Sequence, residues 1–240
     1  MSDHKLQRVR LLDPRVIGHE LSISTTTDRN QRAATFALGA AGSCPDRPSL
    51  TIVIADDSAS ITAQSGHDPL AQRYSEAKQA IDHIGRSCNC RQEFVAVLHF
   101  DQPSPLDVPP QRLHRRGRLR LRSGLRSTGA RGSSDLSPAF DKAERLATQF
   151  RSFSVGIIVM TDFLLTDRDP SEVLGRLVSF EGHVHAVALN AEPPQTLKNA
   201  PHVSISTITQ NSEAGATARA IFESMTANRA LATVHQDPEQ

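Results

Sequence analysis

The sequence has few of the features that mark disulfide-rich, zinc-binding or membrane proteins. It contains three cysteines, Cys44, Cys88 and Cys90. An odd number in a chain of 240 residues argues against the disulfide framework of a small secreted protein. A zinc site would need a second pair of cysteines or histidines at suitable spacing, and the sequence has no such pair to complement Cys88 and Cys90.

Targeting and membrane segments are also missing from the sequence. The first residues, MSDHKLQRVRLL, contain no apolar core of signal-peptide length. No run approaches the about 18 apolar residues of a membrane span. The 27 basic residues nearly balance the 26 acidic ones, so net charge does not indicate a nucleic acid or a membrane surface as partner. We therefore expect a cytoplasmic protein with no membrane contact.

What the sequence does contain is an alternation of apolar runs and helical stripes. The runs LTIVIA (50–55), FVAVLHF (94–100), VGIIVM (155–160) and VHAVAL (184–189) are nearly continuous, as in strands covered on both faces. VSISTI (203–208) alternates and predicts an edge strand. Apolar residues at helical spacing lie between these runs, within 70–84, 136–150 and 173–178, and again within 214–225. The pattern predicts a doubly wound, Rossmann-like α/β fold with a mostly parallel sheet.

The polar ends of the chain set the expected domain limits. We predict an N-terminal extension over 1–48 that builds no core, a single domain over 49–230 and a C-terminal tail over 231–240. Ligands of open α/β sheets bind beyond the carboxyl ends of the strands. The segment TIVIADDSAS (51–60) places Asp56, Ser58 and Ser60 at that edge, at alternate positions that can face one point.

Two later segments bring more oxygen atoms to the same edge. GSSDLSPAF (132–140) has Ser133 and Ser134 before a predicted helix, and VGIIVMTDF (155–163) ends a strand with Thr161 and Asp162. Carboxylate and hydroxyl oxygens without cysteine or histidine suit a hard cation such as Mg²⁺. Serines before a helix also serve as N-caps, so the pair at 133–134 has a second, purely structural interpretation.

Together these three segments resemble the von Willebrand factor A domain and its metal-ion-dependent adhesion site. The family pattern is Asp-x-Ser-x-Ser after the first strand, a Thr in a loop before a helix, and an Asp after the fourth strand. Residues 56–60 match the first element fully. Ser134 stands in place of the Thr, and Phe163 replaces the Gly that usually follows the Asp, here Asp162.

The resemblance covers roughly residues 50–226 and implies both a fold and a site. The fold would have strand order 3-2-1-4-5-6 with one antiparallel edge strand. The metal residues would be Asp56, Ser58, Ser60, Ser134 and Asp162, with Mg²⁺ or Mn²⁺ as the ion. Asp57 and Asp135 are further carboxylates whose direction the sequence leaves open.

The function implied by the resemblance is metal-dependent protein binding by an adaptor that is not an enzyme. The partner would present an Asp or Glu to the ion, and intracellular relatives often work beside ATPases or kinases. Members that have lost the metal site are one alternative.

The other alternative is an enzyme. A metal-dependent hydrolase or phosphotransfer enzyme could use the same acidic cluster, with Asp101 as acceptor in a receiver-like scheme. That scheme needs a Lys after a later strand, where the chain has Asn190. Haloacid-dehalogenase-type phosphatases need an Asp at the position of Ser58. The chain has no G-x-S-x-G elbow, phosphate-binding loop or G-x-G-x-x-G motif.

Residues 111–131, QRLHRRGRLRLRSGLRSTGAR, hold eight arginines. Alternation in RLRLR predicts an antiparallel edge strand with Leu119 and Leu121 inward, and charge on an edge strand prevents pairing with other sheets. A surface for an acidic partner is the second interpretation. Nucleic acid is the third, and the absence of interleaved aromatic residues argues against it.

Overall fold

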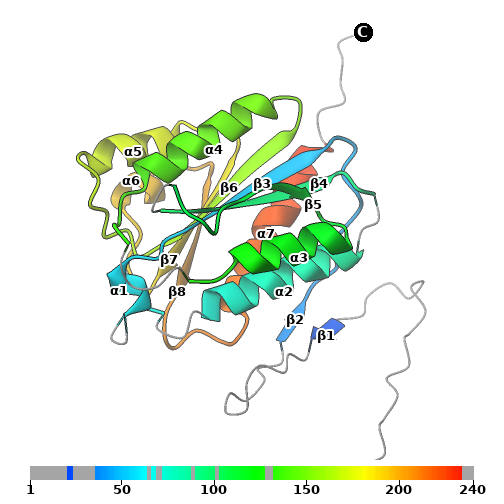
Figure 1. Ribbon diagram of the computed structural model, residues 1–240, viewed down its shortest axis with the longest axis horizontal. Coiled ribbons are helices and arrows are strands. Elements are labelled where there is room, and N and C mark those ends of the chain that lie inside the picture. Colours follow the sequence, from blue (N-terminus) through cyan, green and yellow to red (C-terminus); the bar gives the residue numbers. More distant parts are fainter. Residues whose placement is uncertain are drawn as a thin grey trace, which may run out of the picture.

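Six strands form one sheet at the centre of the molecule (Figure 1). The computed structural model describes residues 21–23, 36–63, 66–68, 72–87, 90–100, 103–127 and 132–233. The sheet has the order β5-β4-β3-β6-β7-β8, and its pairs are parallel except for the antiparallel pair of β4 with β5. Its strands are β3 (Ser49–Ala55), β4 (Glu93–His99), β5 (Val108–Arg112), β6 (Ser154–Thr161), β7 (His183–Leu189) and β8 (Val203–Ile208). If β3 is counted as the first strand of the sheet, this order reads 3-2-1-4-5-6. The predicted doubly wound fold and its strand order are thereby confirmed.

Helices cover both faces of the sheet (Figure 1). One face carries α2 (Gln72–Ser87), α3 (Arg115–Gly124) and α7 (Ala216–Leu231). The other carries α4 (Ser137–Gln149), α5 (Pro170–Val178) and the short α6 (Gln195–Lys198). The single turn α1 (Ala59–Thr62) follows β3 at the carboxyl edge of the sheet.

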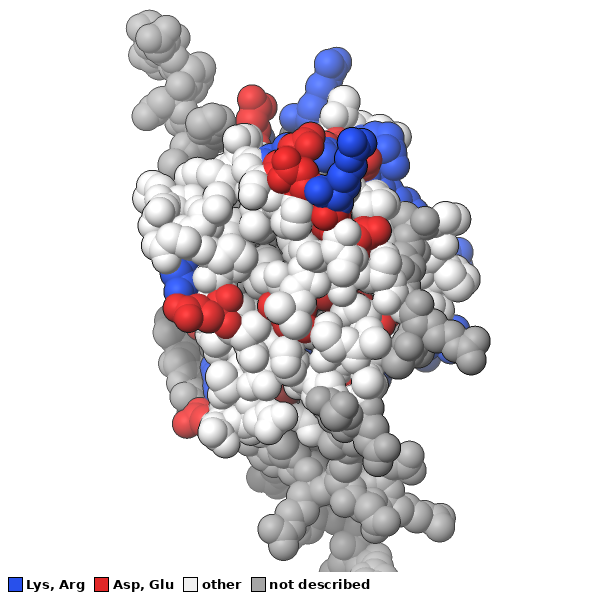
Figure 2. Space-filling view, turned by 90° about the vertical axis from the view of Figure 1, so that its left-hand side faces the viewer, with Lys and Arg blue, Asp and Glu red and all other residues white. Residues whose placement is uncertain are grey.

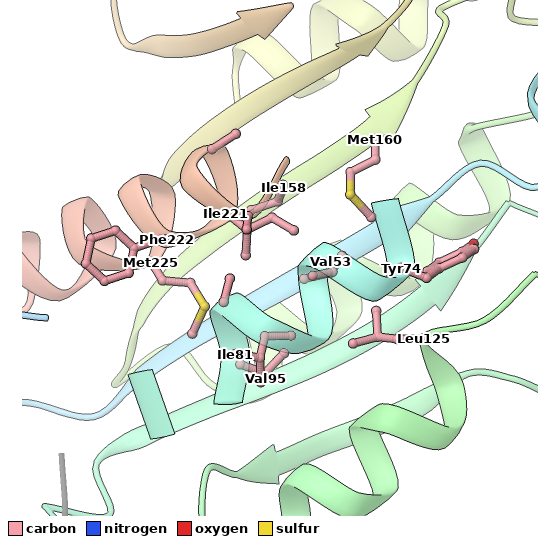
Figure 3. Close-up of a cluster of buried hydrophobic side chains, with 14 of the residues drawn as sticks. Val53, Tyr74, Ile81, Val95, Leu125, Ile158, Met160, Ile221, Phe222 and Met225 are labelled. Atoms are coloured by element: carbon pink, nitrogen blue, oxygen red, sulfur yellow. The ribbon is translucent and has the colours of Figure 1, made fainter. Parts of the chain in front are cut away.

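The nearly continuous apolar strands supply both faces of the core. Val53, Val95 and Ile158 pack with Ile81 of α2 and Ile221 of α7 in one buried cluster (Figure 3). The alternate residues of the same strands form a second buried cluster under α4 and α5, and include Ile52, Ile54, Ala96, Leu98, Ile157 and Val159. Because side chains alternate along a strand, a strand buried on both faces has no polar position, and this explains the unbroken runs.

Part of the predicted N-terminal extension belongs to the core. β1 (Leu21–Ile23) and β2 (Phe36–Leu38) pair as a small antiparallel ribbon. Phe36, Leu38 and Ala41 are buried with the residues of α7, so the expectation that 1–48 builds no core was wrong. Cys44 is disulfide-bonded, which the odd cysteine count did not indicate. Residues 1–20, 24–35 and 234–240 lie outside the described residues.

Residues 115–124 of the arginine segment form a helix, and the prediction of an edge strand in RLRLR was wrong. The antiparallel edge is β5, whose Pro109 and Pro110 suit a strand that pairs on one side only. Gly117 and Leu121 of α3 and its C-cap residue Leu125 are buried at spacings of four, close to the helical period. Leu119 is 58% exposed, so the Leu119–Leu121 alternation did not reflect a shared face.

Close packing between α3 and β5 depends on one glycine. A Cβ atom added at Gly117 would lie 1.9 Å from the carbonyl oxygen of Arg112. The first turn of α3 can therefore follow β5 directly only with glycine at this position.

In the part of the chain that the structure describes, no helix has both the length and the apolar composition to cross a membrane.

A buried histidine on β7 makes the stability of the fold depend on pH. His185 lies 2.9 Å from the Ser206 hydroxyl through its Nε2 atom, and burial lowers its pKa to about 4, with His183 contributing. The unfolded chain takes up this proton near pH 6.5. The contribution of neutral His185 to the free energy of unfolding is therefore fully present above pH 6.5 and is lost as the pH falls towards 4.

We expect the wild-type free energy of unfolding to drop by about 2 kcal/mol from this group between pH 8 and pH 5. His185→Gln should remove that component, because glutamine does not titrate. Urea denaturation at several pH values measures both slopes. Equal slopes in wild type and variant would contradict the prediction.

Candidate metal site at the carboxyl edge

The carboxyl ends of β3 and β6 lie side by side. The two strands pair in register from Ser49 with Ser154 to Ala55 with Met160. The Asp56 amide continues the ladder and donates to the Met160 carbonyl at 3.0 Å. The loop after β3 and the loop after β6 therefore begin at the same level of the sheet. Figure 2 shows this side of the molecule, where acidic atoms lie recessed between neutral side chains near the centre.

Asp56 ties these two loops together. One carboxylate oxygen accepts from the Ser58 amide at 2.8 Å and the other from the Thr161 hydroxyl at 2.6 Å. The side chain is fully buried. Burial raises the pKa of Asp56, the nearby Asp162 carboxylate adds to the rise, and the hydrogen bonds from Thr161 and Ser58 oppose it.

The two serines of the motif face each other. The Ser58 and Ser60 hydroxyl oxygens lie 2.9 Å apart. Ser58 occupies the N-cap position of α1, but its hydroxyl makes no capping bond, and its carbonyl accepts from the Ile61 and Thr62 amides instead. Both hydroxyls therefore have lone pairs that the helix does not use.

The segment that carries Ser134 lies beside this pair. Gly132 forms an isolated parallel bridge with Ser58. Ser134 is buried, and its backbone is held on both sides by Thr166, whose hydroxyl accepts from the Ser134 amide and whose amide donates to the Ser134 carbonyl, each at 3.2 Å. Asp135 points to Thr166, which donates to it at 2.6 Å.

Ser134 does not cap α4. The first free amides of that helix, on Leu136 and Ser137, donate to the two carboxylate oxygens of Asp167, both at 2.8 Å. Leu136 at the N-cap position makes no side-chain capping bond. The structural interpretation of this serine is therefore not supported, because a carboxylate 30 residues downstream does the capping.

Asp162 is the least satisfied member of the group. It is 2% exposed, and one oxygen accepts from the Leu164 amide at 3.0 Å. The other oxygen makes no hydrogen bond within the described residues. His67 Nδ1 lies 3.2 Å from it but is not aligned for a hydrogen bond. Nothing in the sequence indicated His67, which lies outside all three motifs.

Phe163 has a backbone conformation that favours glycine. Its φ of 58° lies in the left-handed region, which costs a bulky residue about 1–2 kcal/mol. The Phe163 amide donates to the Thr161 hydroxyl at 3.0 Å, and its ring packs against the core under α4 and α5. The turn after Asp162 is therefore held by this hydrogen bond and by the packing of the ring.

Asp57 points away from the other carboxylates and into the core. Its Oδ1 accepts from the Arg73 guanidinium at 2.9 Å and from the Tyr74 hydroxyl at 2.6 Å, and its Oδ2 lies 3.0 Å from His99 Nδ1. Arg73 also donates to the Asp56 carbonyl at 2.9 Å and to Asp68 at 2.6 Å. This buried ionic group fixes the start of the loop against α2.

The group fits a hard cation through its oxygen atoms. Among the described residues, no cluster of three or more carboxylate, histidine or cysteine side chains is placed to hold a metal. A cation here would therefore rely on the hydroxyls of Ser58 and Ser60. The Asp162 oxygen that accepts no hydrogen bond and the nearby Asp56 carboxylate supply oxygen donors of the kind that Mg²⁺ prefers.

Comparison with known proteins supports the fold. A von Willebrand factor type A protein from Catenulispora acidiphila is 18% identical, with a TM-score of 0.56 over 76% of this chain and 43% of that one. The pilus adhesin SpaC from Lactobacillus rhamnosus GG is 11% identical, with a TM-score of 0.60 over 78% of this chain and 31% of that one.

A third solved structure, proximal thread matrix protein 1 from the mussel byssus, is 16% identical with a TM-score of 0.51 over 78% of this chain. This chain covers less than half of each of these three proteins, 43%, 31% and 48%. No family model matches the sequence, and no curated protein does. The chain thus has the fold of von Willebrand factor A domains.

The buried ion pair behind the site generates a stability prediction. Arg73→Met should lower the free energy of unfolding by about 3–5 kcal/mol, because the Asp57 carboxylate would lose its charged partner in the interior. Asp57→Asn combined with Arg73→Met should cost less than Arg73→Met alone. Chemical denaturation measures both, and a double variant that is less stable than the single one would contradict this account.

Proposed function

We propose that this domain binds a protein partner through a divalent cation held at the carboxyl edge of its sheet. The main support for this proposal is the buried Asp162 oxygen that accepts no hydrogen bond and lies close to the buried Asp56 carboxylate. Two like charges in one desolvated place destabilise a metal-free fold, and a cation relieves both.

The ligands we assign are those of the predicted motif. Ser58, Ser60 and Ser134 would provide hydroxyl oxygens. Asp56 and Asp162 would provide the negative charge. Bound Mg²⁺ or Mn²⁺ would supply a positive centre that attracts a carboxylate oxygen from outside the domain. Thr161 keeps Asp56 in place, and Thr166 with Asp167 keeps the Ser134 loop in place.

The charge of the site favours an acidic group on the partner. Serine hydroxyls are neutral donors, so the two assigned carboxylates only balance the charge of a divalent ion. We therefore assign the open position to a Glu or Asp side chain of the partner. This makes the domain an adaptor, as in proteins that work beside ATPases or kinases, and not an enzyme.

No specific observation favours the alternative of a hydrolase or phosphotransfer enzyme. Asp101, the acceptor in the receiver-like scheme, lies outside the described residues. Asp57, the extra carboxylate of the motif, is occupied by Arg73, Tyr74 and His99 and is not directed at the site.

A cytoplasmic location stays a prediction. The disulfide at Cys44 weighs against it, because disulfides form and persist mainly in oxidising compartments.

Metal binding should stabilise the fold. At free Mg²⁺ or Mn²⁺ about a hundredfold above the dissociation constant, linkage gives about 2.7 kcal/mol. For a domain of this size, this raises the melting temperature by roughly 5–10 °C relative to EDTA. Thermal melts in the two conditions measure the shift.

Asp162→Asn is the matched control for these melts. It removes one charge but keeps the shape of the side chain, so it should abolish the shift while being at least as stable as wild type in EDTA. Identical melting temperatures with and without metal in wild type, or an undiminished shift in the variant, would contradict the metal site.

Partner binding should require the same residues. We expect a protein captured in Mg²⁺ to be released by EDTA and to be absent with Asp56→Ala or Asp162→Asn. Ser134→Thr should keep or tighten binding, because the added methyl group restrains χ1. Pull-down followed by mass spectrometry identifies the partner, and replacing its acidic residues by amides then locates the ligand. Binding that persists in EDTA and in both variants would place the partner elsewhere on the domain.

A further inference from the structure

A pocket rich in arginine lies at the opposite edge of the sheet from the candidate metal site. Its volume is about 460 Å³. It is formed by the end of α2, the beginning of β4 and the junction of β5 with α3. We call it the arginine pocket. Five basic side chains line it: Arg86, Arg91, His114, Arg115 and Arg118.

Packing fixes the floor of the arginine pocket. The Arg118 guanidinium donates to the carbonyls of Gly85 and Leu113, both at 2.8 Å, and its Nε lies 3.2 Å from Asp82. A Cβ atom at Gly85 would lie 2.8 Å from the Arg118 side chain, so glycine permits this close approach. Arg118 is therefore a structural element of the pocket wall.

The carboxylates near the arginine pocket are already paired. Both oxygens of Glu93 accept from Arg229, at 2.7 Å in each case. Asp82 is shared by Arg118, by Arg122 at 3.3 Å and, more distantly, by Arg86 at 3.9 Å. Arg91 and Arg115 have no carboxylate within ion-pair distance among the described residues. The pocket thus carries an excess of positive charge that the domain does not balance.

The start of α3 adds to this excess. Arg115 and Arg116 occupy its first turn, which has no acidic residue, and the positive end of a helix dipole disfavours cations there. By contrast, a carboxylate meets the first amides of α2 (Asp68), α4 (Asp167), α5 (Asp169) and α7 (Glu76). Arg91 has a φ of 59°, a conformation that costs a non-glycine residue about 1 kcal/mol or more.

We propose that the arginine pocket binds a phosphate-class oxyanion. A guanidinium group forms paired hydrogen bonds with phosphate oxygens, and Arg91 and Arg115 have their guanidinium groups available for this. A doubly charged anion between them would offset the excess charge of the pocket and the unfavourable placement of arginines at the start of α3. The ligand could be a free phosphate or a phosphorylated side chain of a protein, because both present the same group.

Isothermal titration in EDTA tests this proposal separately from the metal site. The probes are inorganic phosphate, pyrophosphate and a short phosphoserine peptide beside its unphosphorylated form. We expect saturable binding of pyrophosphate or phosphopeptide that weakens at least tenfold in Arg91→Gln combined with Arg115→Gln. Binding of the peptide but not of the free ions would identify a protein source, and the reverse would identify a small-molecule source.

The matched control is Arg116→Gln combined with Arg120→Gln. These residues lie on the same helix but do not line the pocket, and the pair removes the same charge. We expect its affinity to stay within twofold of wild type, with circular dichroism confirming that both variants are folded. Absence of binding to every probe, or equal weakening in the two variants, would overturn the proposal. Binding of duplex DNA or anionic vesicles that weakens equally in both variants would likewise assign the arginines to a general basic surface.

Discussion

The hydrogen bond from the Thr161 hydroxyl to Asp56 connects the two central loops of this molecule. It joins the residue that follows β3 to the last residue of β6, and the two strands pair in register up to Ala55 and Met160. Thr161 also accepts from the Phe163 amide, so one hydroxyl sets the position of Asp56 and the turn after Asp162 together. The close approach of two buried carboxylates follows from this arrangement.

Buried charge in the domain falls into two kinds. Asp57 and Glu93 are matched by Arg73 and Arg229 at hydrogen-bond distance, so these pairs serve the fold. Asp162 lacks such a partner for one of its oxygens. Among the described residues, the nearest basic group to that oxygen is His67 Nδ1 at 3.2 Å, which is not aligned for a hydrogen bond, and the proposed cation would lie beside this oxygen.

The two edges of the sheet have opposite electrostatic character. Acidic oxygens gather where β3 and β6 end, and arginines gather where β4 begins and β5 meets α3. One strand length separates these edges, which is more than the about 8 Å Debye length at physiological salt. The domain therefore has two chemically distinct surfaces on one rigid sheet.

The sequence alone determined the core strands and most helix positions, because strands buried on both faces leave unbroken apolar runs that alternate with helical stripes, and the resemblance to von Willebrand factor A domains added the strand order. It also predicted that Asp56, Ser58, Ser60 and Asp162 lie at one edge, since parallel strands end together, and the resemblance added Ser134. It could not separate a helix from a strand in the arginine segment, where Leu119 and Leu121 alternate but only the spacing of Gly117, Leu121 and Leu125 reflects burial. Only the tertiary structure decided that Asp57 turns inward to Arg73, that Asp167 caps α4 in place of Ser134, and that His67 lies beside Asp162. Each of these contacts joins residues that are separated along the chain, and no local propensity or period records which of several polar side chains will meet.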